Sequence, residues 1–213
     1  MQTVKRYLYI FFLLLSSSLV FPENILSVIS EGGVMFEYGE YDNKKTESTI
    51  FPMGLRIQDR YYNNSIIGIT GQASISYPVF ISSEYGYVLD KDWHLYKGGY
   101  DSAIIFGLGG GLSIGLLNGF QTMFVDIGIV THYFFINNSY AEYFNFSSGL
   151  YLNLSWGLDY GFAIWELGLY GGWDLFSSSQ TKLKNNTIEY KGGYNLPYFG
   201  FFTGVGFRTG KKI

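Results

Sequence analysis

Apolar and polar positions alternate along most of this chain. In the segment YFNFSSGLYLNLSW, residues 143–156, the even positions are apolar except Ser148, and the odd positions are small, polar or tyrosine. A period of two is that of a β-strand, because successive side chains of a strand point to opposite faces. The segment therefore predicts a strand with one apolar face and one polar face.

The same alternation predicts seven further strands. Apolar rows recur in the segments 28–41, 49–60, 66–81, 103–116, 123–135, 163–175 and 199–208. Eight strands of this kind, with no helical periodicity between them, predict an all-β fold built from antiparallel neighbours.

The connections between these strands fall into two kinds. Tight-turn signals stand at Tyr62-Asn63-Asn64, Asn118-Gly119 and Asp159-Tyr160-Gly161. Longer polar stretches separate the other neighbours, at 42–48, 82–99, 137–142 and 177–193. Short turns at one end and long loops at the other, on an even number of strands, are typical of an up-and-down transmembrane β-barrel of the bacterial outer membrane.

The composition decides which face meets water. Charged residues make up only 15% of the chain, against roughly 25% in soluble domains, while aromatic residues reach 20%. The small and polar row consists mainly of Gly, Ser, Asn and Tyr, which suits a narrow lumen better than the outside of a soluble barrel or sandwich. The apolar row from Met123 to Phe135 covers about 40 Å of strand, or about 30 Å of bilayer after a tilt of about 40°. We therefore expect the apolar row to face lipid.

The segment AIIFGLGGGLSIGLL, residues 103–117, offers an alternative as a transmembrane helix with GxxxG pairs. The segment is shorter than the roughly 20 residues that a spanning helix needs, and each glycine would cost about 1 kcal/mol of helix propensity. All but one of its glycines fall on a single face of a strand, so we predict a strand here.

The first 22 residues have the pattern of a secretory signal peptide. Lys5 and Arg6 precede the apolar run 7–15, and small residues follow at 16–18. The run is too short for a membrane anchor, so we predict cleavage of 1–22 and a barrel domain over 23–213. The net charge of −3 becomes −5 without Lys5 and Arg6, which excludes a polybasic nucleic-acid binder. The chain has no cysteine and therefore no thiolate chemistry.

With these features, residues 23–213 resemble the small eight-stranded outer-membrane proteins of the OmpA-barrel, OmpX and OmpW type. The last strand, GFFTGVGF at 200–207, is similar to the C-terminal signal that the barrel-assembly machinery reads, although the chain continues to Ile213. The resemblance implies a monomeric barrel in the outer-membrane bilayer of a two-membrane bacterium, exported through its signal peptide.

Charged residues on the polar row are candidates for a lumen charge cluster. Strand parity places four of them in the lower half of the lumen and two higher up: Arg56, Asp126, Glu166 and Arg208, then Glu37 and Asp174. Unpaired charges in a narrow barrel are costly, so we expect hydrogen-bonded pairs that fill the interior. The competing interpretation is a gate or a proton-conducting chain.

An enzymatic role would have to use the two histidines. Some outer-membrane barrels modify lipid A through His with Ser and in places Asp, and this chain has His94 in a loop and His132 on the polar row. Asp126 lies about 20 Å along the strand from His132, too far for a hydrogen bond. We therefore predict no enzyme and no cofactor. We also predict no metal site, because no cluster of metal ligands occurs in the sequence.

The long loops are the remaining candidates for function. The loop 82–99 carries aromatic and imidazole side chains among charges, namely Tyr85, Tyr87, Trp93, His94 and Tyr96. Exposed aromatic residues with mixed charge suit contact with a host or cell-surface ligand. We predict a structural or surface-interaction, adhesion-like protein; the alternatives are a narrow channel for small or hydrophobic solutes, which the OmpW resemblance implies, and a lipid A-modifying enzyme.

Overall fold

A computed structural model describes residues 23–41, 44–63, 66–83, 102–118, 120–137, 141–183, 189–192 and 194–210. The predicted signal peptide and the predicted loop contacts between Tyr85 and Tyr96 lie outside these residues. The strands are β1 (Glu23–Tyr41), β2 (Lys44–Tyr62), β3 (Ile67–Ser83), β4 (Ser102–Asn118), β5 (Gln121–Asn137), β6 (Ala141–Asp159), β7 (Ala163–Leu183), β8 (Glu189–Gly192) and β9 (Tyr194–Gly210).

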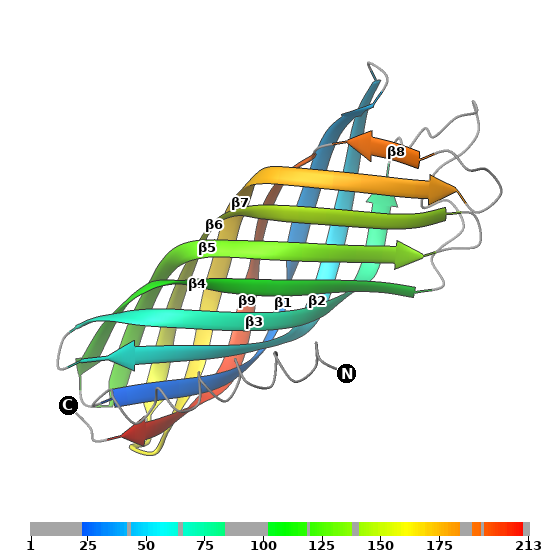
Figure 1. Cartoon of the computed structure of the whole chain (residues 1–213). Coiled ribbons are helices and arrows are strands. Elements are labelled where there is room, and N and C mark those ends of the chain that lie inside the picture. The colour runs from blue at the N-terminus through cyan, green and yellow to red at the C-terminus, as the bar shows by residue number, and fades with distance from the viewer. Residues whose placement is uncertain are drawn as a thin grey trace, which may run out of the picture.

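The sheet closes on itself as an antiparallel barrel (Figure 1). Each strand from β1 to β7 pairs with the next, β7 pairs with β9, and β9 pairs with β1 from Gly210–Glu23 to Tyr194–Gly39. The short strand β8 pairs with β7 beyond the end of β9, inside the stretch predicted as a loop. Eight strands therefore form the wall, as the alternation predicted.

The two rows of side chains face as predicted. On β5, Met123, Ile127 and Ile129 are half-exposed on the outer surface, whereas Phe124 and Asp126 are buried in the lumen. The outer surface of the wall is thus apolar, which is the surface that a bilayer requires of a barrel. The segment 103–117 lies within β4, so the alternative of a transmembrane helix is wrong. Among the described residues, no helix is long and apolar enough to span a membrane.

Three of the four predicted long loops are shorter than expected. Strand β2 begins at Lys44, β6 at Ala141, and β7 continues to Leu183, so that strand pairing extends into stretches predicted as loops. The prediction ended each strand where its apolar row ended, but backbone pairing continues with polar side chains where the strands leave the bilayer. We name the two ends of the barrel by their connections. The short-turn end carries the short connections after Tyr62, Asn118 and Asp159, the start of β1 and the end of β9. The opposite end is the long-loop end.

The wall is open at one place near the long-loop end. Strands β3 and β4 pair only as far as Ser76 and Ile105, whereas β3 pairs with β2 up to Ser83. The ends of β1 and β2 also diverge from the ends of β4 to β7 at this end (Figure 1). The upper part of the barrel is therefore splayed, while the lower part is a tight cylinder.

Candidate functional site

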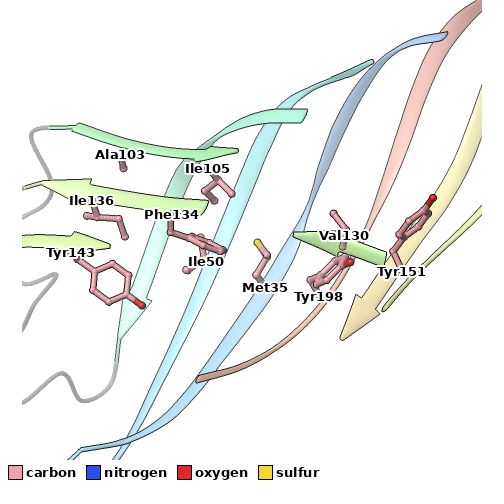
Figure 2. Packing of buried hydrophobic residues seen from close by; sticks show 10 residues of the cluster. All are labelled: Met35, Ile50, Ala103, Ile105, Val130, Phe134, Ile136, Tyr143, Tyr151 and Tyr198. Carbon is pink, nitrogen blue, oxygen red and sulfur yellow. The ribbon is translucent and has the colours of Figure 1, made fainter. Parts of the chain in front are cut away.

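The lumen is the candidate site, and it is built in layers. At the short-turn end four fully buried side chains form the lower apolar layer: Ile25, Tyr62, Phe124 and Ile164. Towards the long-loop end ten buried residues form the upper apolar layer (Figure 2): Met35, Ile50, Ala103, Ile105, Val130, Phe134, Ile136, Tyr143, Tyr151 and Tyr198. The charged side chains described next lie mainly between these two layers.

Arg60 on β2 forms the centre of the polar layer. Its Nε and Nη2 donate to the carboxylate of Asp126 on β5 at 2.9–3.2 Å, and its Nη1 donates to both oxygens of Glu166 on β7 at 3.0 and 3.1 Å. All three side chains are fully buried. One guanidinium therefore ties together three strands that are far apart in the sequence, and we name these residues the Arg60 layer.

Polar neighbours complete the hydrogen bonds of the two carboxylates. Gln58 and Ser113 donate to Asp126 at 2.7 and 2.5 Å, and Ser27 donates to Glu166 at 2.6 Å. Charge-assisted hydrogen bonds of this kind are what make a buried ion pair tolerable.

A second arginine, Arg56, lies two inward positions higher on β2. Its Nη1 is 3.4 Å from a carboxylate oxygen of Glu31 and 3.4 Å from the amide oxygen of Asn153. Its guanidinium carbon lies 4.6 Å from the ring centroid of Phe202 and 5.5 Å from that of Tyr170. A cavity of about 40 Å³ adjoins this side chain.

Arg208 on β9 lies at the short-turn end, where it is the cross-strand partner of Ile25 on β1. Its Nε is 2.6 Å from Glu23 on β1, and its Nη1 is 2.9 Å from Asp159 at the end of β6. The same Nη1 donates to the carbonyl oxygen of Gly161 in the β6–β7 turn, where the φ of 91° favours glycine. Arg208 thus holds the first and last strands of the barrel against a turn.

His132, Ser147 and Asp174 meet at the level of the upper apolar layer. Asp174 accepts hydrogen bonds from the Ser147 hydroxyl and from His132 Nδ1, the latter at 3.1 Å. The Ser147 hydroxyl bonds to the carboxylate and not to the imidazole.

Five of the six residues predicted as a lumen charge cluster are described, and none of them pairs with another member of the set. Asp126 and Glu166 pair with Arg60, Arg56 with Glu31, Arg208 with Glu23 and Asp159, and Asp174 with His132. Glu37 lies on β1, but its side chain is outside the described part of the structure.

Arg60, the residue that connects two of the predicted acids, was missed by the sequence analysis. Arg60 is the last residue of the predicted strand 49–60 and is not among the residues predicted for the lumen charge cluster. The signal was present, because Arg60 has the same parity as Arg56 and must face the lumen if the strand continues. Strand β2 does continue, to Tyr62.

A larger cavity of about 590 Å³ lies at the long-loop end against β4, β5 and β6. Apolar side chains, among them Ile104, Phe135 and Phe144, form most of its lining, and Asn137 and Glu142 are among its polar members. We name it the rim cavity. Within the described residues, no group of three or more His, Asp or Glu side chains could hold a metal ion.

Comparison with solved structures finds the same fold in the outer membrane protein OprG from Pseudomonas aeruginosa. The TM-score is 0.59 at 12% identity, over 87% of this chain and 96% of that one. Weaker similarity is found to the attachment invasion locus protein Ail of Yersinia pestis, with a TM-score of 0.43 at 12% identity over 88% and 99% of the two chains. The outer membrane protease OmpT from Escherichia coli gives a TM-score of 0.41 at 10% identity over 88% and 97%. No protein-family profile and no curated protein sequence matches the chain.

At these identities the similarity to OprG concerns the fold. A closed eight-stranded antiparallel wall with an apolar outer surface and a polar interior defines an integral membrane β-barrel of the outer-membrane type.

Proposed function

We propose that this protein is a monomeric, non-enzymatic barrel of the bacterial outer membrane whose lumen does not conduct and whose role is exerted at the long-loop end, as a structural or surface-interaction protein. The observation that carries the proposal is the filled lumen, in which the fully buried ion pairs of Arg60 with Asp126 and Glu166 lie next to the lower apolar layer. Conduction of ions through the barrel would need a continuous polar path along the lumen, whereas binding at the surface would not.

The lower apolar layer opposes the passage of ions. The side chains of the lower layer, for example Phe124 and Ile164, are at most 1% exposed. A hydrated ion would have to shed its water to pass such a constriction, and hydrophobic constrictions close pores by excluding water. The guanidinium of Arg60 is hydrogen-bonded to carboxylates on two sides, which opposes its displacement by a membrane potential and the opening of a path past it.

Single-channel recording in planar bilayers tests whether the filled lumen conducts ions. We expect wild-type protein to give no resolvable conductance steps in molar KCl. A matched variant, Phe124→Ala, removes one ring of the lower apolar layer and leaves the Arg60 layer in place, so it should remain silent as well. Regular conductance steps from the wild-type protein would contradict the proposal and favour the channel interpretation.

The surface role is tested by deletion of residues 85–96, which include the predicted contacts Tyr85, Tyr87, Trp93, His94 and Tyr96. We expect the deletion to abolish any binding of cells that express the protein to host cells or to neighbouring bacteria, while the barrel still folds. A matched control deletes 185–187, in the connection before β8. Retained adhesion after the first deletion would rule out this loop as the contact.

The absence of enzymatic activity is likewise part of the proposal. It is supported by the Ser147 hydroxyl, which contacts Asp174 and not the ring of His132. Mass spectrometry of lipid A from cells with and without the gene should give the same acyl pattern. A difference that disappears in the variant His132→Ala would establish an enzyme.

The rim cavity favours a second candidate, the uptake of small apolar molecules at the long-loop end. Its volume of about 590 Å³ lies in the range of small-molecule sites, and its lining is mostly apolar. Binding of a neutral fluorescent apolar probe to the folded protein should weaken in the variant Ile136→Glu. Equal binding by wild type and variant would show that the probe occupies detergent alone.

A further inference from the structure

The guanidinium group of Arg56 lies near two aromatic rings and has contacts at one nitrogen, but its Nε–Nη2 edge has no hydrogen-bond partner among the described residues. The rings of Phe202 and Tyr170 lie against the group, and Nη1 faces Glu31 and Asn153. Its Nε and Nη2 are both buried, and neither has a hydrogen-bond partner among the residues that the structure describes. These two nitrogens form the fork with which arginine binds an oxyanion through two parallel hydrogen bonds.

Arg60 provides an internal reference for this fork. In Arg60 the same two nitrogens, Nε and Nη2, hold the carboxylate of Asp126 at 2.9–3.2 Å. Arg56 is only 4% exposed and its Nε and Nη2 are buried, but none of the carboxylates that the structure describes occupies its fork. Leaving a buried charged donor without a partner costs free energy, which a bound acceptor would recover.

The cavity of about 40 Å³ beside Arg56 has room for such an acceptor. A single water needs about 10–15 Å³ of this kind of space, so the cavity fits about three waters or one ion of similar size. The lining is rich in groups that can donate hydrogen bonds, including Ser74, Ser76, Tyr170 and Tyr198. Among the described residues that line it, Glu31 carries the one carboxylate, and this carboxylate is 3.4 Å from Arg56 Nη1, farther than the contacts of Arg60.

We propose that the fork of Arg56 binds one small monovalent anion, of the size of formate, nitrate or chloride, in this cavity. The anion takes the position at Arg56 that the carboxylate of Asp126 takes at Arg60. It supplies the acceptors that Nε and Nη2 of Arg56 lack, and it fixes β2 against the cavity-lining residues of β6 and β7. The site is independent of the surface role proposed above.

Unfolding of the detergent-folded protein by urea tests the site. Refolded samples are compared in sodium formate, nitrate, chloride and gluconate at equal ionic strength, because gluconate is too large for the cavity. For the wild type we expect the folded-to-unfolded ratio to rise with the concentration of formate or nitrate, by about a hundredfold at about one hundred times the dissociation constant.

The variant Arg56→Lys is the decisive comparison, because it keeps the charge and lacks the fork. General salt effects act on wild type and variant alike, so only the anion-specific difference should disappear. Ser27→Ala, which removes a hydrogen bond of the Arg60 layer, should lower stability and keep the anion dependence. Equal dependence in wild type and Arg56→Lys, or no dependence in the wild type, would mean that the cavity holds only water and would overturn the proposal.

Discussion

Arg60 shows how one residue organises the interior of this barrel. It is fully buried, shares its donors between Asp126 and Glu166, and lies with its guanidinium carbon 4.4 Å from the ring centroid of Phe124. It therefore connects the ion-paired middle of the lumen to the lower apolar layer. Removing it would leave two carboxylates buried without a cation, which is far more costly than exchanging the whole group for apolar residues.

The variant Arg60→Met is expected to lose about 3–5 kcal/mol of unfolding free energy, the usual range for breaking a buried ion pair from one side. Urea unfolding in detergent, followed by tryptophan fluorescence, measures the loss. The triple variant Arg60→Met, Asp126→Asn, Glu166→Gln removes all three charges and should recover part of the stability. A single variant as stable as the wild type would contradict the role of the Arg60 layer.

At the short-turn end Arg208 on β9 forms ion pairs with β1 and β6 and a hydrogen bond with the β6–β7 turn. In Arg208→Ala, Glu23 and Asp159 lose their shared cation, and we expect about 3 kcal/mol of destabilisation in the same assay. Arg208→Lys should recover less than half of the loss, because one ammonium cannot reproduce the separate contacts of Nε and Nη1. Unchanged melting together with a large new ion conductance would instead identify Arg208 as a gate.

At the scale of the elements, glycines on the lumen face let neighbouring strands approach closely. Gly111 on β4 and Gly128 on β5 are cross-strand partners, and a Cβ on Gly128 would lie 2.2 Å from the carbonyl oxygen of Gly110. This contact is with backbone, which cannot move aside as a flexible side chain would. Glycine therefore alternates with larger residues on the lumen face because the narrow lumen has no room for a side chain at every inward position.

The pair Gly128→Ala and Gly71→Ala tests this packing. The first should destabilise the barrel by about 1–3 kcal/mol, as overpacking in a filled interior does. The second places its methyl group on the outer face, where nothing lies within 4 Å, and should be neutral or stabilising by up to about 1 kcal/mol. Similar urea midpoints for the two variants would mean that the β4–β5 approach is not as close as described.

At the scale of the whole molecule, closure between β9 and β1 removes every free strand edge from the lower part of the barrel. A closed wall satisfies all backbone hydrogen bonds inside the bilayer, which is the condition for a β structure to span it. Residues 23–213, folded in detergent, should therefore give a β-rich circular dichroism spectrum and a gel band that shifts on boiling. A helical spectrum, or solubility without detergent, would contradict the lipid-facing assignment of the apolar row.

The wall of this barrel follows from the alternation of residues along the chain. A period of two, repeated in eight segments and combined with few charges, is enough to define strands, their two faces and the face that meets lipid, because each of these depends on local alternation and composition. Even the turn at Asp159-Tyr160-Gly161 follows from local chemistry, since Gly161 adopts a positive φ.

The contacts in the lumen, by contrast, depend on how the closed strands are placed relative to one another. The pairs Arg60–Asp126, Arg56–Glu31 and Arg208–Glu23 join residues on different strands, and parity says that such side chains face inward without saying at which height they meet. The position of a side chain along the barrel axis is set by the strand register and by where each strand begins and ends. Both depend on backbone pairing that continues past the apolar rows, so the pattern of residues alone does not identify the partner of each charge.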